Sequence, residues 1–510
     1  MVRILFCIFW VGAIVACQPP KQAAKPAEDS PAEVQVTIPA PLDLRKSVVR
    51  INSTLQSWSL SQPWQRNDPD QRYSLGAVVG PQQVLTSAEM VADATYIELE
   101  SVDAKHFVQA KVLVVDYEVN LALLGPLDSG KANGLFDGMV PLEIAKPLKI
   151  GDSLQAVQVE ANGELLQTSG NLQSIDLIST FMDDHQFLTY LLKGSMQSAA
   201  SSFSLPVLTD GKLAGVLATY DSEDQISQVV ATEIVAKFLA QAAEGNYQGF
   251  PSLGVGAATT EDSTFRAWLK LTDEQGGLYI SKVRKGGAAD LAGVQSGDVL
   301  LAVDGQKIDR RGYFEHPQYG NLFWGHLIRG ARMVGESVKL SMLRKGEPIE
   351  VSAALTRLAE ADKIVPTYQF GIAPNFLVKG GLVFQELTLD VLKSFGENWQ
   401  TRAPLDFLNA LENPEEYEGK VRRVVFLSGS IPTPATVGYE SLRQMIVSEV
   451  NGVPVKDMKS LIEAFSKQEN SMHRIEFQED RFTIQLDEVL ATRVDEQLLQ
   501  RGIPRLSRAQ

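Results

Sequence analysis

A cluster of serines lies near the middle of the chain, with acidic residues and a histidine just before it. These residues are Ser195, Ser198, Ser201, Ser202, Ser204, Asp183, Asp184 and His185. Such types could build a hydrolase site, because a serine hydroxyl becomes nucleophilic when an oriented imidazole takes its proton. Serines between strands are more often turn formers that bond the backbone. Residue types alone therefore leave a relocated nucleophile and a structural loop open, and we favour the loop.

The order of residues around Pro206 adds information. The stretch 195–220 contains this proline, a short apolar run, the turn Asp210-Gly211 and a second apolar run, as the last two strands of a trypsin-like barrel do. It resembles the HtrA/Deg family, whose sequence here is Gly-Asn-Ser-Gly-Gly-Pro and whose loop amides form the oxyanion hole. Counted back from Pro206, the nucleophile position holds Phe203.

The other two catalytic positions of that family are also replaced. The stretch 84–91, VLTSAEMV, resembles Leu-Thr-Asn-Ala-His-Val, and the base position holds Glu89. The stretch 110–124, AKVLVVDYEVNLALL, resembles the segment that ends Asp-Leu-Ala-Leu-Leu, and the position of the orienting aspartate holds Asn120. The apolar strand pattern around each position is retained.

These replacements remove the triad chemistry. Phenylalanine has no nucleophilic atom, and a carboxylate at Glu89 is a weaker base than an imidazole whose pKa lies near working pH. Triad residues act as a unit, so the loss of all three leaves no triad mechanism. The sequence therefore predicts no catalytic residue, and Glu89, Asn120 and Phe203 are vacated positions.

The sequence does not support a metal site or a cofactor. The remaining histidines, His106, His316, His326 and His473, show no ligand spacing. We expect neither a metal nor another cofactor.

Length and composition describe the chain that must position these residues. Its 510 residues with 44% hydrophobic content suit about three domains, each with its own core. A net charge of -15 and the absence of basic runs argue against nucleic acid as a partner.

The N-terminus reads as a lipoprotein signal. Arg3 precedes the apolar run 4–15, which is too short for a stable transmembrane helix. Ile14-Val15-Ala16-Cys17 resembles the bacterial lipobox, which implies cleavage after residue 16 and acylation of Cys17. Multiple acyl chains anchor a protein stably. The resemblance implies a location in the cell envelope on the periplasmic side, with the outer membrane favoured because Gln18 is not aspartate. An ordinary signal peptide with an incidental cysteine is the alternative.

Residues 17–44 are rich in Pro, Ala, Gln and Lys and predict a disordered tether. Residues 45–249 form the expected trypsin-like domain, with strands at 47–52 and 74–79 and a closing helix from Thr232.

Residues 250–358 resemble a PDZ domain. Ser252, Leu253, Gly254 and Val255 match the loop whose amides receive a peptide C-terminus while the peptide adds to a strand edge. The Gly297-Asp298 turn and the strand up to Asp304-Gly305 follow in PDZ order. We expect residues 321–332 to form the helix beside the groove. Its surplus of apolar residues would line the groove or pack against another domain.

Residues 364–510 resemble the second, unusual PDZ domain of plant-type Deg proteases, through Pro374-Asn375-Phe376 to Leu387, Glu449 to Gly452 and the tail from Ile503. The resemblance implies a homo-oligomer based on trimers.

The predicted fold is mainly β, a trypsin-like double β-barrel followed by two PDZ-like α/β domains. The predicted function is that of a lipid-anchored pseudoprotease. It would bind peptide or unfolded-protein C-termini as a scaffold or holdase, or modulate an active Deg-family protease. The alternatives are an active serine endopeptidase with a non-standard site and a tethered structural spacer.

Overall fold

The computed structural model describes residues 43–160, 162–183, 185–194, 204–467, 470–478 and 482–509. The predicted site residues Cys17 and Phe203, and the serines at 195, 198, 201 and 202, lie outside these residues, as does Asp184. Among the described residues, no helix is long and apolar enough to span a membrane.

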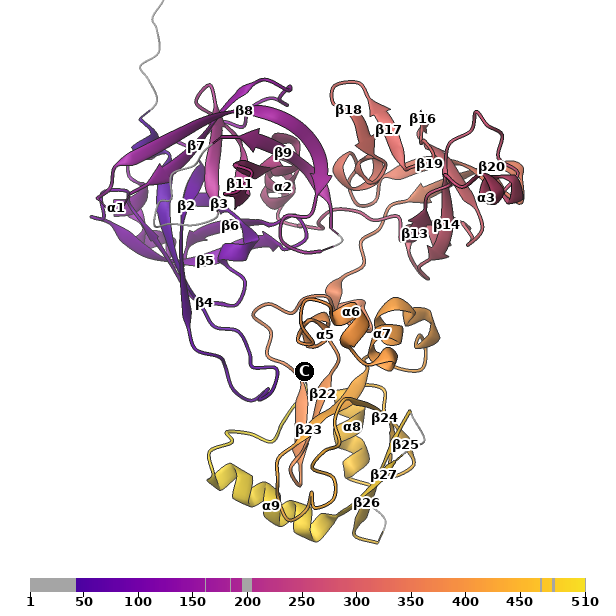
Figure 1. Ribbon diagram of the computed structural model, residues 1–510. Coiled ribbons are helices and arrows are strands. Elements are labelled where there is room, and N and C mark those ends of the chain that lie inside the picture. The colour runs from indigo at the N-terminus through magenta and orange to yellow at the C-terminus, as the bar shows by residue number, and fades with distance from the viewer. Residues whose placement is uncertain are drawn as a thin grey trace, which may run out of the picture. The chain divides into compact units, whose positions relative to one another are not determined.

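The first globular part contains two closed six-stranded barrels (Figure 1). The first barrel has the order β1-β2-β3-β6-β5-β4, and the second has the order β10-β11-β12-β9-β8-β7. The strands of the first barrel are β1 (Val48–Leu55), β2 (Asp70–Gly80), β3 (Gln83–Thr86), β4 (Ala94–Glu100), β5 (Phe107–Asp116) and β6 (Leu121–Pro126). Those of the second are β7 (Ser153–Val159), β8 (Leu165–Ile178), β9 (Phe187–Lys193), β10 (Leu205–Thr209), β11 (Lys212–Asp221) and β12 (Ile226–Ala231).

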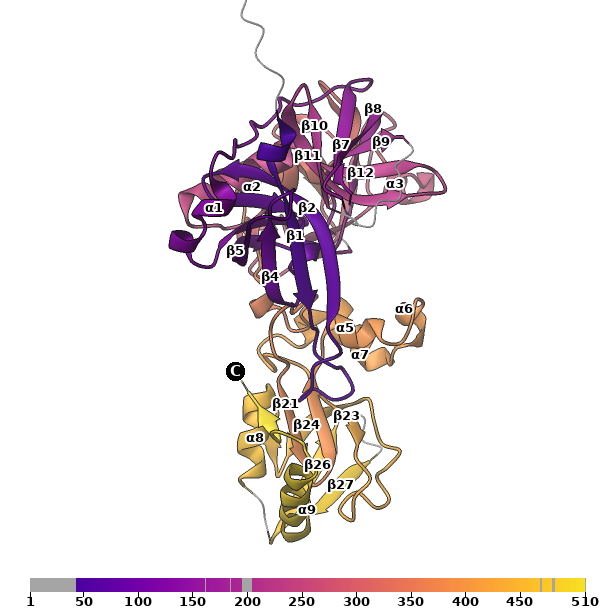
Figure 2. The same cartoon turned by 90° about the vertical axis from the view of Figure 1, so that its left-hand side faces the viewer.

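Figure 2 shows β1 and β2 running side by side towards the loop that joins them, residues 56–69. The helices of this part are α1 (Asn133–Phe136), α2 (Thr232–Glu244) and the short 3-10 turns Leu44–Lys46, Ala88–Met90 and Ser129–Lys131.

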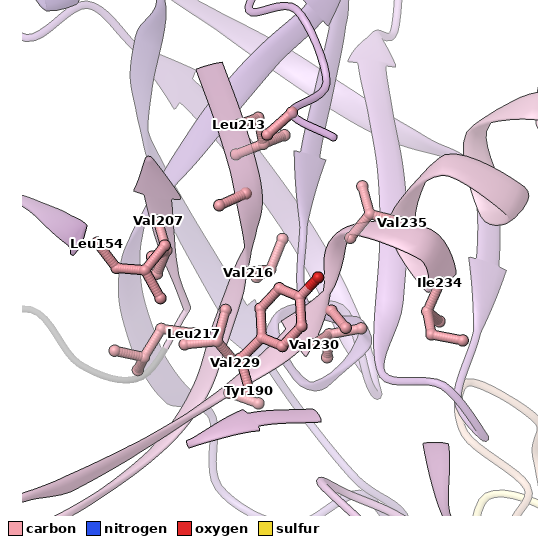
Figure 3. Close-up of a cluster of buried hydrophobic side chains, with 14 of the residues drawn as sticks. Leu154, Tyr190, Val207, Leu213, Val216, Leu217, Val229, Val230, Ile234 and Val235 are labelled. Atoms are coloured by element: carbon pink, nitrogen blue, oxygen red, sulfur yellow. The ribbon is translucent and has the colours of Figure 1, made fainter. Parts of the chain in front are cut away.

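Alternating apolar residues fill the second barrel. Val207, Leu213, Val229 and Val230 point inward with the ring of Tyr190 (Figure 3), and all are buried. The same core cluster contains Leu44, which directly precedes the predicted start of this domain at residue 45.

The next part is one sheet with the order β13-β14-β15-β19-β20, in which β13 is an edge strand. Its strands are β13 (Val255–Ala258), β14 (Leu278–Val283), β15 (Val299–Val303), β16 (Gln306–Lys307), β19 (Ser337–Arg344) and β20 (Glu347–Ala354). A separate hairpin joins β17 (Tyr313–His316) to β18 (Gly320–Phe323). The helices are α3 (Ser263–Trp268), α4 (Ala288–Leu291) and a π-helix, His326–Gly330.

The expected helix at 321–332 is therefore wrong in its first part. Asn321–Phe323 belong to β18, and helical structure begins near His326. The apolar excess serves both roles that the sequence left open. Leu322 is in the barrel core cluster, whereas Trp324 and Ile328 are in the core of this sheet.

The last part is a sheet with the order β27-β26-β24-β23-β22-β21-β28 and its own core. Its strands are β21 (Phe376–Lys379), β22 (Leu382–Glu386), β23 (Val425–Ser430), β24 (Met445–Val450), β25 (Val453–Pro454), β26 (Met472–Phe477), β27 (Thr483–Asp487) and β28 (Ser507–Arg508). Its helices are α5 (Leu389–Lys393), α6 (Trp399–Arg402), α7 (Leu405–Glu412), α8 (Met458–Phe465), α9 (Glu488–Gln500) and the 3-10 turns Glu360–Asp362 and Pro414–Glu416. The predicted fold class, a mainly β double barrel followed by PDZ-like sheets, is confirmed.

Candidate functional site

Glu89 lies in the short 3-10 turn after β3. Arg72 on β2 donates to its carboxylate Oε1 at 3.0 Å and to its backbone oxygen at 3.2 Å. The carboxylate is thus held in a half-buried ion pair and faces a cation.

Asn120 adjoins Glu89 but does not orient its side chain. The buried Asn120 Oδ1 accepts a hydrogen bond from the backbone N–H of Glu89 at 3.0 Å. Its φ of 57° is a left-handed conformation that asparagine tolerates better than most residues. Its Nδ2 is buried and has no partner within the described part of the chain. The amide therefore fixes the loop backbone, and no base–orienter pair forms.

Ser204 follows directly after the position of Phe203 and is fully buried. Its Oγ accepts from the backbone N–H of Ser87 at 2.9 Å and lies 2.9 Å from Thr86 Oγ1. Neither partner is a base, so this hydroxyl is a structural bridge between β3 and the start of β10. Its φ of 134° lies in a region that favours glycine, and the resemblance places glycine at this position.

His185 and Asp183 have partners elsewhere. His185 Nδ1 lies 3.4 Å from Glu118 Oε2 without forming a hydrogen bond, and Asp183 pairs with Lys393 at 2.7 Å. Burial, with Arg329 and Lys363 nearby, lowers the pKa of His185 to about 3, so the ring is neutral at ordinary pH. These contacts do not link the imidazole to Ser204.

A buried ion cluster lies next to His185. Arg357 donates to both carboxylate oxygens of Asp116, at 3.1 and 3.2 Å, and lies 3.0 Å from Glu118. Tyr247 Oη donates to Asp116 at 2.8 Å, and burial raises the pKa of Tyr247, so it remains a donor. This cluster joins the turn after β5 to the segment that follows β20.

The predicted peptide-binding residues lie at the start of β13. Gly254 has a φ of +75°, which permits the tight loop, and its N–H donates to Ser252 Oγ at 3.1 Å. The loop is fixed from outside, because Leu253 O accepts from Ala289 N and Gly254 O accepts from Arg284 N. Among the hydrogen bonds of the described residues, Leu253 N–H has no acceptor, so it is free for a ligand oxygen.

A cavity of about 180 Å³ opens beside this loop. Residues of all four predicted positions line it, together with residues that the sequence did not single out for the site. The additional lining residues are Leu177, Gln186, Pro251, Phe323, Trp324, Gly325, Ile328 and Arg329. Phe323, Trp324 and Ile328 belong to the apolar surplus of residues 321–332, which the sequence predicted would line the groove or pack against another domain. Leu177 and Gln186 come from the second barrel, and no local pattern indicates them.

The second PDZ-like sheet differs at the corresponding edge. Its strand β21 follows Pro374-Asn375, as β13 follows the loop of the first sheet. The outer edge of β21 is paired with β28, whereas no described strand pairs with the outer edge of β13.

The described residues contain no group of three or more His, Cys, Asp or Glu side chains that could hold a metal ion.

Comparisons with known proteins cover both the PDZ-like sheets and the chain as a whole. PDZ domain profiles match residues 365–505 and 279–313. The chain is 25% identical over 482 residues to "Putative protease Do-like 3, mitochondrial" of Arabidopsis thaliana, covering 93% of this chain and 81% of the relative. It is 24% identical over 452 residues to "Protease Do-like 2, chloroplastic" of the same plant, covering 87% and 72%.

Among solved structures, "HtrA-type protease AlgW with decapeptide" matches with a TM-score of 0.46 and 16% identity, covering 62% of this chain and 97% of that one. The chain is therefore similar along most of its length to Do-like proteases of the Deg/HtrA type, and two of its segments match PDZ domains.

Proposed function

We propose that this protein is a pseudoprotease of its family that acts by binding peptides or unfolded proteins. The observation that carries this proposal is the state of the base position. The Glu89 carboxylate is paired with Arg72, and Asn120 Oδ1 accepts a hydrogen bond from the Glu89 backbone N–H. The ion pair directs this carboxylate towards a cation rather than towards a hydroxyl. The phenylalanine at position 203 offers nothing for it to deprotonate.

The binding site in this proposal is the groove beside Ser252–Val255. The free N–H of Leu253 and the left-handed loop at Gly254 suit a terminal carboxylate, and the edge of β13 suits an extended peptide. The cavity is lined mainly by apolar side chains, including Leu177, Trp324 and Ile328. An apolar terminal residue is therefore the preferred ligand.

The proposal places the protein in the cell envelope, anchored through acylated Cys17, with the outer membrane favoured. The tether would hold the folded part away from the membrane. Binding would serve a scaffold or holdase role, or modulate an active Deg-family protease, and trimer-based assembly follows from the family resemblance alone.

The competing function is a serine endopeptidase with a relocated nucleophile. A fluorophosphonate probe and unfolded casein, applied to the same preparation, separate the two functions. We expect neither labelling nor cleavage, while labelling of any serine would overturn the proposal.

The binding function is tested separately with fluorescent peptides that end in a free or an amidated apolar residue. Only the free terminus should bind well, because amidation removes the charged acceptor of the loop amides. Gly254→Ala should weaken binding by about tenfold or more, since a side chain is strained at this φ and the loop must shift.

Gly286→Ala is the matched control. It lies in the same domain with a φ of +70° and open space around it, but it does not line the cavity. Equal affinity for free and amidated peptides, or equal effects of the two substitutions, would contradict a carboxylate-binding groove.

A further inference from the structure

The C-terminal strand β28 occupies the outer edge of β21 in the second PDZ-like domain. The pairing is antiparallel, with Phe376 opposite Arg508 and Leu377 opposite Ser507, and Val378 N–H donates to Leu506 O at 2.6 Å. Because the strands are antiparallel, the chain end runs towards Pro374-Asn375. This is the direction in which a peptide that adds to a strand edge would approach the preceding loop.

The strand pairing itself is short. Only two residues form β28, and Ser507 is exposed. A few backbone hydrogen bonds contribute little net stability to a flexible chain end. The contacts of one side chain, Arg508, are therefore decisive.

Arg508 joins this strand to the loop between β1 and β2. Its guanidinium lies 4.5 Å from the ring centroid of Trp58 and 5.3 Å from that of Phe376. Its Nη1 donates to Pro374 O at 3.1 Å and to Pro63 O at 3.4 Å. The side chain thus bridges a loop of the first barrel and the β21 strand.

The loop has further contacts on the same sheet. The Trp64 ring lies 6.0 Å from the Phe376 ring, and Gln385 Nε2 donates to Leu60 O at 2.9 Å. Trp64 also packs against the core of the second PDZ-like domain, as does Leu506. Phe376 is therefore contacted by both the loop and the C-terminal strand.

The bridge also contains a repulsive element. Arg66 lies over the same Trp58 ring at 4.6 Å, so two guanidinium groups share one indole. Burial, with Arg505 and Arg66 nearby, lowers the pKa of Arg508. The contact is therefore suited to release as well as to binding.

We propose that Trp58 and Arg508 form a latch that couples the β21 edge to the first barrel. While β28 is in place, the edge is closed and the loop 56–69 is docked. A peptide that takes the edge must displace Arg508, and this loosens the loop from the second PDZ-like domain. The occupant that the structure identifies is the chain's own C-terminal segment, so its sequence provides the probe.

The test uses a labelled octapeptide with the sequence of residues 503–510, IPRLSRAQ. The full chain carries Gly254→Ala, which weakens peptide binding at the first groove. The octapeptide should bind weakly when the latch is intact. It should bind about tenfold more tightly to Arg508→Ala, because loss of a cation–π contact and its hydrogen bonds weakens the internal competitor. The second arginine of the octapeptide corresponds to Arg508. An octapeptide with alanine at this position should not show the tenfold increase in affinity for the Arg508→Ala chain.

Hydrogen exchange of the loop 56–69 supplies a second measurement. Saturating octapeptide should accelerate exchange of this loop in the chain that retains Trp58 and Arg508. Trp58→Ala should show fast exchange even without peptide. Trp268→Ala, an exposed tryptophan on α3, is the control and should change neither measurement.

Unchanged affinity in Arg508→Ala would overturn the latch, and so would unchanged exchange of the loop at saturating peptide. Neither result would affect the proposed function, because peptide capture by the first groove is measured in the chain that retains Gly254.

Discussion

At the scale of single residues, Glu89, Asn120 and Ser204 are held by contacts with neighbouring backbone and side-chain groups. Asn120 and Glu89 are joined through an amide oxygen and a backbone N–H, Glu89 is paired with Arg72, and Ser204 bridges Thr86 and Ser87. Each contact is structural. Among the described residues, the buried Asn120 Nδ2 has no partner.

Ser204 allows this interpretation to be measured. Ser204→Ala should lower the free energy of unfolding by about 1–3 kcal/mol, because it leaves the buried Ser87 N–H without an acceptor. Ser204→Gly loses the same hydroxyl but relieves a φ that favours glycine, an effect of about 1–3 kcal/mol that offsets the greater freedom of glycine in the unfolded chain. Chemical denaturation should therefore rank the glycine variant at least as stable as the alanine variant. The reverse order would show that the backbone at Ser204 is not strained.

At the scale of elements, the parts that the sequence predicted are those marked by local patterns. The Gly297-Asp298 turn and the following strand were predicted, and Asp298 is buried and paired with Arg344. The helix from Thr232 was predicted from apolar spacing and is α2. The sequence singled out Glu89 and Asn120 from their flanking strands, and the structure brings the two residues into contact.

Other elements could not be predicted because their role depends on distant residues. Residues 321–323 were predicted to begin the helix beside the groove, because the order of elements in a PDZ domain places one there. They form β18 instead, and the hairpin β17–β18 packs against the barrel, where Phe314, Tyr319 and Leu322 join the barrel core. Leu177 lines the groove, and the loop 56–69 docks on the last sheet, only because of contacts between residues far apart in the sequence. No local sequence pattern predicts either feature.

The hairpin supports a prediction about how the elements are joined. Tyr319 Oη donates to Glu233, Gln318 Nε2 donates to Leu148 O at 3.0 Å, and Leu322 is fully buried. Leu322→Ala should cost about 2–5 kcal/mol of stability, because it removes a buried side chain and leaves a cavity. Limited proteolysis should then cut within residues 311–323.

Leu291→Ala is the control for this substitution, because Leu291 is 72% exposed on α4. It should change stability by no more than about 0.5 kcal/mol. Similar losses in the two variants would mean that the hairpin does not contribute to the barrel core.

At the scale of the whole molecule, the first PDZ-like sheet is joined to the barrels through side-chain contacts. The cavity beside Ser252–Val255 is lined partly by the barrel residue Leu177, and the buried cluster of Asp116, Glu118 and Arg357 ties a barrel turn to the segment after β20. The barrels therefore complete the wall of this cavity.

The contribution of the ion cluster to this connection can be measured as a change in the free energy of unfolding. The side chains of Asp116 and Glu118 are 0% and 6% exposed, and that of Arg357 is 19% exposed. Arg357→Leu should lower the free energy of unfolding by about 3–5 kcal/mol, because it leaves two buried carboxylates without their cation. Thermal unfolding should then separate the barrels from the following domain as two transitions.

Lys105→Ala provides the comparison. Lys105 pairs with Asp103 at 3.0 Å, but the two side chains are 74% and 50% exposed, so water screens the pair and its loss should change the stability only slightly. If Arg357→Leu proved as mild as this surface variant, the cluster could not be what couples the two parts. A large loss with a single transition would instead show that other contacts, such as the hairpin on the barrel, maintain the coupling without Arg357.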